Sequence, residues 1–137
     1  MGTYDVYHTD KKREEDGTWV TLADGSKWLI ARGRSARSRK ALRDAERPYQ
    51  NLIRQNERTG RSMPDEVQDK IHLEWAVNGL VLNWDGVTGP DGQVLEFSAD
   101  NLRKVLTDLP DLFLEIVQQA SEVTNFHSEK EEEEVKN

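Results

Sequence analysis

The chain has 137 residues, of which 35% are hydrophobic and 33% are charged, and its formal net charge is −7. It contains no cysteine, which excludes a disulfide scaffold, a thiolate metal site and a cysteine nucleophile. No run approaches the ~18 apolar residues of a membrane span, and no signal-peptide pattern opens the chain. We therefore expect one lean, soluble domain that acts inside the cell.

The N-terminal third predicts extended structure. Tyr4, Val6 and His8 alternate with polar residues, as in a short strand, and the charged residues 11–16 predict a loop. Two β-prone runs then flank an Asp-Gly step, which predicts a β-hairpin over about 18–31 because glycine accepts a positive φ without steric cost.

Residues 35–58 show the spacing of an amphipathic helix. Ser35 can cap its start, and apolar residues recur every three or four positions. Pro48 lies inside this run and removes a helix hydrogen bond, so we expect a kink there, or two helices that meet. Gly60 is suited to the end of the element.

Three further helices follow in the sequence. Pro64 and the acidic residues after it mark the start of a helix over 64–84, which is apolar on most sides in its second half and should be central. Caps and apolar spacing predict helices over about 98–108 and 110–125. Residues 127–137 have almost nothing to bury, and we expect a disordered acidic tail.

These elements predict a mainly α fold. An isolated two-stranded hairpin is marginal in water, so the N-terminal hairpin should lean on the helices. We expect a single α-rich domain over residues 1–126, with the hairpin packed on a bundle of four or five helices.

The stretch VLNWDGVTGPDGQVLEFSADN carries two Asp-Gly steps and raises the question of a calcium site. A twelve-residue loop from Asp85 would end at Glu96, the place of a bidentate acid. Val87 stands where an oxygen ligand is needed, and Pro90 occupies the place of the required glycine. We therefore interpret the stretch as a rigid connector. The residues with a predicted structural role, in this connector and in the helix before it, are Trp75, Trp84, Asp85, Gly86, Asp91, Gly92 and Phe97.

No motif of enzyme chemistry occurs in the sequence. It lacks GxSxG, a phosphate-binding loop and HExxH, and the histidines His8, His72 and His127 are scattered. We therefore expect no enzymatic activity, no metal and no cofactor.

The charges are divided unevenly along the chain. Residues 31–61 hold ten Lys or Arg and three acidic residues, a net charge of +7, so the rest of the chain carries −14. The segment Arg32–Arg43 concentrates the basic residues and could bind phosphates or an acidic protein. The overall acidity and the absence of interleaved aromatic residues favour an acidic partner, or a solvated helix face, over nucleic acid.

Several motifs occur in a fixed order over residues 4–126. They are the hairpin DGTWVTLADGSKWLIAR, the ERPY inside the first long helix, the connector quoted above and LPDLFLEIVQQASEVTNF. Their most specific parts are LNWDGV, the second Asp-Gly, Phe97-Ser98 before Asn101, and Leu109-Pro110 before Phe113. Together they resemble the tail assembly chaperones of long-tailed, siphovirus-like bacteriophages.

The resemblance implies a small, mainly helical protein without enzymatic activity. Members of that family bind the tape measure protein and help recruit tail tube subunits during tail morphogenesis. They act in the cytoplasm of the infected host cell and are generally absent from the finished virion. The resemblance supplies no catalytic, metal-binding or cofactor-binding residue.

Partner contacts are predicted for two sets of residues. An apolar helix face would cover the stripes of a long helical partner, while a basic set could steer an acidic segment or link one chaperone copy to the next. The candidates are Arg37, Arg39, Lys40 and Arg43 for the basic set, and Leu112, Phe113, Ile116 and Val117 for the apolar set.

Other interpretations stay open at this point. The periodicity of the apolar set fits an ordinary core equally well. The chain could instead be a nucleic-acid-binding protein that uses Arg32–Arg43, or a structural head–tail or tail component.

Overall fold

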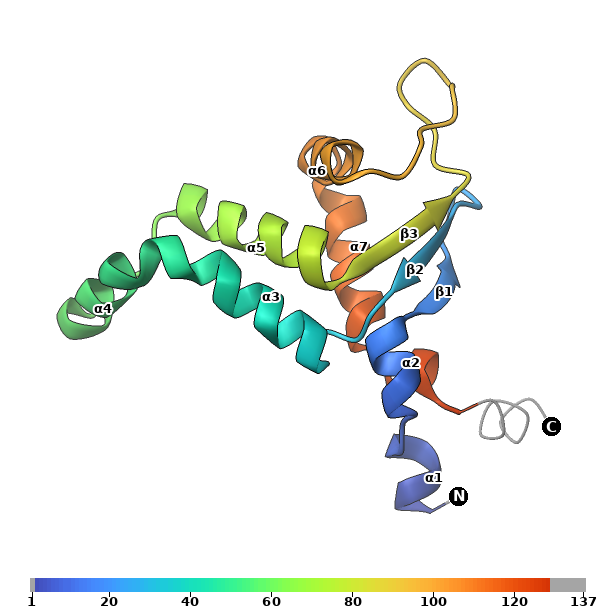
Figure 1. Cartoon of the computed structure of the whole chain (residues 1–137), viewed down its shortest axis with the longest axis horizontal. Coiled ribbons are helices and arrows are strands. Elements are labelled where there is room, and N and C mark those ends of the chain that lie inside the picture. The colour runs from blue at the N-terminus through green and yellow to red at the C-terminus, as the bar shows by residue number, and fades with distance from the viewer. Residues whose placement is uncertain (1, 129–137) are drawn as a thin grey trace.

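The computed structural model of the protein describes residues 2–128. Helices dominate the chain, and a small sheet lies beside them (Figure 1). The mainly α fold with a hairpin is therefore confirmed. The elements are α1 (Thr3–Tyr7), α2 (Lys11–Asp16), β1 (Thr18–Thr21), β2 (Lys27–Ile30), α3 (Ala36–Glu46), η1 (Arg47–Tyr49), α4 (Gln50–Thr59), α5 (Asp65–Gly79), β3 (Val81–Asp85), α6 (Ala99–Asp108), α7 (Pro110–Ser121) and η2 (Val123–Phe126).

The predicted hairpin is formed by β1 and β2, which pair antiparallel. Its turn is held by Asp24, whose Oδ1 accepts hydrogen bonds from the backbone N–H of Ser26 at 3.0 Å and from its hydroxyl at 2.6 Å. Gly25 supplies the positive φ of 87° that the turn requires. The hydroxyl of Ser26 also accepts from Trp28 Nε1 at 2.9 Å, which ties the turn to the core.

The prediction of one helix over 64–84 is wrong at its C-terminal end. The helix α5 ends at Gly79, and the residues after it form β3, the third strand, antiparallel to β2. Trp84 thereby comes opposite Trp28, with the two ring centroids 5.1 Å apart in an edge-on arrangement. A short apolar run cannot be assigned to helix or strand by periodicity alone. Here the run forms a strand because the central strand β2 offers a free edge with which it can pair.

The break at Pro48 is confirmed. Ser35 caps α3 by accepting from the N–H of Ser38 at 3.2 Å, and the one-turn helix η1 with Pro48 separates α3 from α4. Gly60 closes α4 in the left-handed conformation with φ 71°. A positive φ suits Gly60 because glycine has no Cβ that would clash with the backbone in the left-handed conformation.

The helices α3 and α5 run side by side and form an arm with α4 at its tip (Figure 1). Their closest approach is at Gly79, where an added Cβ would lie 2.5 Å from the Cβ of Ala41. Trp75 Nε1 on α5 donates to the hydroxyl of Ser38 on α3 at 2.8 Å.

The core lies where α5, α6 and α7 meet the sheet. Its centre consists of side chains that are at most 2% exposed: Trp28, Ile30, Leu80, Leu102, Leu106 and Ile116. Residues 86–97 leave this body as a long connector between β3 and α6 (Figure 1).

Both sequence-based assignments for the first 16 residues are wrong. The predicted extended stretch is the helix α1, and the predicted charged loop is the helix α2. Asp10 explains the second difference, because its carboxylate accepts from the backbone N–H groups of Lys12 at 2.9 Å and Arg13 at 3.3 Å. The carboxylate of Glu15 in turn accepts from the first N–H groups of α3, so α2 supports the start of the arm.

The domain extends past the predicted boundary at residue 126. His127 is 3% exposed and its Nε2 lies 3.0 Å from the carbonyl oxygen of Val6, so its assignment to a disordered tail is wrong. The remainder of the predicted acidic tail, residues 129–137, lies outside the described residues. Among the helices of the described chain, none is long and apolar enough to cross a membrane.

Candidate functional site

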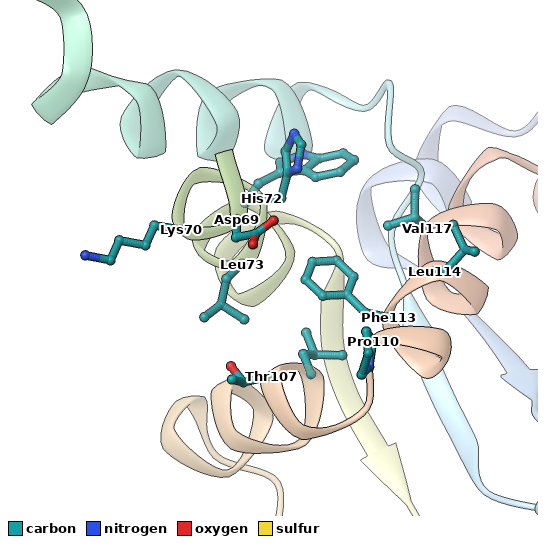
Figure 2. A pocket seen from close by; sticks show the side chains of 11 residues that line it. Asp69, Lys70, His72, Leu73, Thr107, Pro110, Phe113, Leu114 and Val117 are labelled. Atoms are coloured by element: carbon teal, nitrogen blue, oxygen red, sulfur yellow. The ribbon is translucent and has the colours of Figure 1, made fainter. Parts of the chain in front are cut away.

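A groove with a cavity volume of about 700 Å³ lies between α5 and the α6–α7 corner. Figure 2 shows the Phe113 ring pointing from α7 toward α5, and the Lys70 side chain pointing away from the groove. Its lining residues are Asp69, Lys70, His72, Leu73, Trp75, Leu106, Thr107, Pro110, Phe113, Leu114 and Val117.

The groove has an apolar floor and a polar rim on α5. Leu73, Phe113 and Val117 are half-buried and pack against the core, while Leu114 is 56% exposed. His72 on the rim is exposed, and its ring centroid lies 6.4 Å from that of Trp75 in an edge-on arrangement. Such a surface can bury apolar side chains of a partner, and it offers polar contacts mainly along α5, with Thr107 on α6 as a further polar group.

The sequence of α7 explains why this surface stays open. Ile116 and Ala120, four positions apart, face the core and are at most 1% exposed. Phe113 and Val117, with the same spacing, line the groove instead. The helix α7 is therefore apolar on two faces, and only one of them is covered by the sheet and α6.

The structure divides the predicted apolar contact set. Ile116 is 0% exposed and belongs to the core, so the prediction of a partner contact is wrong for it. Leu112 is half-buried against the core and does not line the groove, whereas Phe113 and Val117 do. Sequence reasoning missed Leu114. Its signal was the unbroken run Leu112–Leu114, which is longer than one helix face can bury.

The predicted basic set lies on a different part of the molecule. Arg37, Arg39, Lys40 and Arg43 are exposed on α3, away from the groove. Lys40 pairs with Asp44 at 3.0 Å, and its hydrogen bond lowers the pKa of the Asp44 carboxyl.

Arg32, the first residue of the basic segment, is not part of that exposed set. It is 9% exposed, its Nε lies 3.4 Å from Glu14 Oε2, and its guanidinium lies 5.5 Å from the centroid of the Phe126 ring. The contact with Glu14 is an ion pair without hydrogen-bond geometry, since Arg32 Nε makes no hydrogen bond to the described residues. Arg32 therefore joins α2, η2 and the start of α3, and it is unavailable to phosphates.

Several residues of the predicted structural set make contacts within the connector. Trp84 Nε1 donates to the carbonyl of Leu95 at 2.9 Å, and the Trp84 and Phe97 ring centroids lie 5.2 Å apart. Gly86 and Gly92 each adopt a φ of 79° at the two turns. Asp85 and Asp91 are exposed, and Asp91 Oδ1 accepts from the N–H of Gln93 at 3.0 Å, as in a polar turn.

The connector shows no calcium geometry. Between residues 2 and 128, no three His, Asp or Glu side chains come together as a metal site. What the described side chains offer is therefore contact surface: an apolar groove and a basic helix face.

Comparison with known proteins places the chain in a phage context. Residues 34–137 match the family described as YdaY prophage protein, a match that begins directly before α3 and covers the arm, β3, α6 and the groove. No curated protein and no solved structure matches the chain. The chain belongs to the YdaY prophage protein family and is a phage-derived protein.

Proposed function

We propose that this phage-derived protein is a tail assembly chaperone that holds a helical segment of the tape measure protein in the groove between α5 and α7. The observation that carries the proposal is the groove itself, a largely apolar hollow of about 700 Å³ that the side chains of residues 2–128 leave unfilled. The tape measure protein is proposed as the partner because the order of motifs in the sequence resembles that of tail assembly chaperones. Membership of a prophage protein family supports a role in a phage.

The groove suits an amphipathic helix better than an extended peptide. Its floor is formed by side chains on helices, without a free strand edge, so it offers apolar contacts rather than backbone hydrogen bonds. Helix-in-groove recognition uses apolar anchors at helical spacing, which a long helical tape measure protein would repeat along its length. The polar rim at Asp69 and His72 can then fix the rotation of the bound helix.

In this function the protein acts by binding alone, without a chemical step, metal or cofactor. It would work in the cytoplasm of the infected host cell, keep the apolar stripes of the tape measure protein covered, and release them as tail tube subunits arrive. A chaperone with this cycle leaves before the particle is complete, so it should be absent from the mature virion.

Leu114→Glu tests the groove. The side chain is 56% exposed, so the folded chain tolerates a carboxylate there, and an acidic residue near the start of α7 favours the helix dipole. A bound partner would bury that charge without a counter-ion, which should weaken binding by at least about tenfold. The assay is co-purification of the tagged chain with co-expressed tape measure protein of the same phage.

Val94→Glu is the matched control. Val94 is an exposed apolar residue, 72% accessible, and it lies on the connector outside the groove. The Val94→Glu variant should co-purify with the tape measure protein as the natural chain does. Equal binding by the Leu114→Glu variant would rule out the groove as the site.

Mass spectrometry of purified virions separates the chaperone from a structural role. We expect the protein in lysates of infected cells and not in finished particles. A stoichiometric amount in the particles would instead identify a head–tail or tail component.

A further inference from the structure

The side of α3 that faces away from α5 carries positive charge that residues 2–128 do not fully pair. Ser38 and Ala41 turn toward α5 and are buried, and the basic residues occupy the remaining positions. Asp44 pairs with Lys40 at 3.0 Å and with Arg47 at 3.1 Å. The side chains of Arg37, Arg39 and Arg43 have no ion pair within residues 2–128.

This surplus continues along α3 and α4, whereas α5, the third helix of the arm, holds four acidic residues and one Lys. Residues 33–61 hold nine Lys or Arg and three acidic residues, a net charge of +6, and none of the nine is buried. We call this surface the basic face; it consists of Arg34, Arg37, Arg39, Lys40, Arg43, Arg47, Arg54, Arg58 and Arg61.

An opposite surplus lies on another part of the molecule. Residues 81–111 hold six acidic and two basic residues, a net charge of −4. Arg103, one of the two basic residues, already pairs with Glu74 at 3.1 Å and with Asp100 at 3.4 Å. The acidic residues of this segment are all exposed, and we call them the acidic face: Asp85, Asp91, Glu96, Asp100, Asp108 and Asp111.

The two faces are set apart by the fold. Figure 1 shows α3 and α4 on one side of α5, and α6 with the connector 86–97 on the other side. Charges separated by more than about 10 Å of solvent are largely screened at 0.1 M salt, so two faces on opposite sides of a helix attract each other only weakly within one copy. Two copies placed end to end bring them together.

We propose that the protein associates head to tail with further copies of itself, through the basic face of one copy and the acidic face of the next. The contact joins two different surfaces, so each added copy leaves one basic and one acidic face open. The opposite charges of the two faces favour this partner over nucleic acid, because the chain as a whole is acidic and repels a polyanion. None of the residues of the two faces lines the groove.

The first experiment measures self-association of the purified full chain by sedimentation velocity. The average mass should rise with protein concentration at about 0.05 M salt and fall back to that of the monomer at about 0.5 M, because the Debye length shrinks from roughly 14 Å to roughly 4 Å. A monomer at every concentration in low salt would overturn the proposal. No tape measure protein is present, so the result is independent of the groove.

Charge reversal locates the contact. Arg39→Glu/Arg43→Glu removes the basic face, and Glu96→Lys/Asp108→Lys removes the acidic face; none of these residues lines the groove. Each double variant alone should associate at least about tenfold more weakly, because like charges then oppose each other.

A mixture of the two variants is the decisive control. In the mixture, the reversed and now acidic face of the first variant can bind the reversed and now basic face of the second. The unchanged acidic face of the first can likewise bind the unchanged basic face of the second, so association should return. Failure of the mixture to associate, with both variants folded by circular dichroism, would rule out the head-to-tail contact. Binding of a duplex oligonucleotide by the natural chain, without self-association in its absence, would identify the basic face as a nucleic-acid site instead.

Discussion

The indole of Trp75 on α5 donates a hydrogen bond of 2.8 Å to the hydroxyl of Ser38 on α3, 37 positions earlier in the chain. Ser38 is 0% exposed, and its N–H is itself held by the cap residue Ser35. One hydroxyl therefore joins the start of α3 to the helix that forms one wall of the groove. This bond fixes the orientation of Trp75, which lines the groove.

Ser38→Ala should destabilise the protein by about 1–2 kcal/mol. The indole N–H loses its partner at a cost of about 1–3 kcal/mol, while the higher helix propensity of alanine returns about 0.5 kcal/mol. Urea unfolding followed by tryptophan fluorescence measures the difference. Ser62→Ala, at an exposed position outside the helices, is the control and should stay within about 0.5 kcal/mol of the natural chain.

Gly79→Ala should be destabilising by about 1–3 kcal/mol, although alanine normally stabilises a helix relative to glycine. The new Cβ would lie 2.5 Å from the Cβ of Ala41 and 3.0 Å from the Cα of Ser38, so α3 must move away from α5. Adding Ala41→Gly removes the nearer clash and should restore part of the loss. Strict additivity of the two substitutions in thermal unfolding would show that the helices do not meet there.

Glu14→Gln should cost about 2–4 kcal/mol, because it leaves the guanidinium of Arg32 buried without its counter-charge. The two side chains are only 11% and 18% exposed, so added salt should change this loss little. Asp44→Asn is the matched control on the exposed pair with Lys40, and its loss of stability should be much smaller because solvent screens that pair. Equal losses in chemical denaturation would contradict a special role for the buried pair.

The hairpin turn should add an acid-sensitive contribution to stability. The hydroxyl of Ser26, and then its backbone N–H, lower the pKa of the Asp24 carboxyl, while slight burial opposes them. A pKa that is lower in the folded chain stabilises the fold above the unfolded value of about 3.9, and this contribution is lost as pH falls through the folded value. An NMR titration should find the Asp24 carboxyl below that reference. A normal or raised pKa would show that the turn does not hold the charged form.

The features that were predicted correctly from the sequence depend on residues only a few positions apart. The Asp-Gly step at residues 24–25 sets the hairpin because its φ requirement is local, and Ser35 and Ser98 cap helices by bonding N–H groups three positions on. Pro48 breaks the helix since it carries no N–H of its own.

The features that the sequence did not decide depend on partners far along the chain. Residues 81–85 form a strand because the edge of β2 is available. Arg32 looked like the first of an exposed basic set, and Glu14 and Phe126 bury it.

The sequence by itself determined that this protein is mainly helical, carries an uneven charge and offers no enzyme motif. Only the tertiary structure decided which face of α7 is core and which is groove. Periodicity marks both Ile116 and Phe113 as apolar, and it contains no information on which face the sheet will cover. Burial is a property of the packed elements together, so the candidate site became visible only when α5, α6 and α7 were placed against one another.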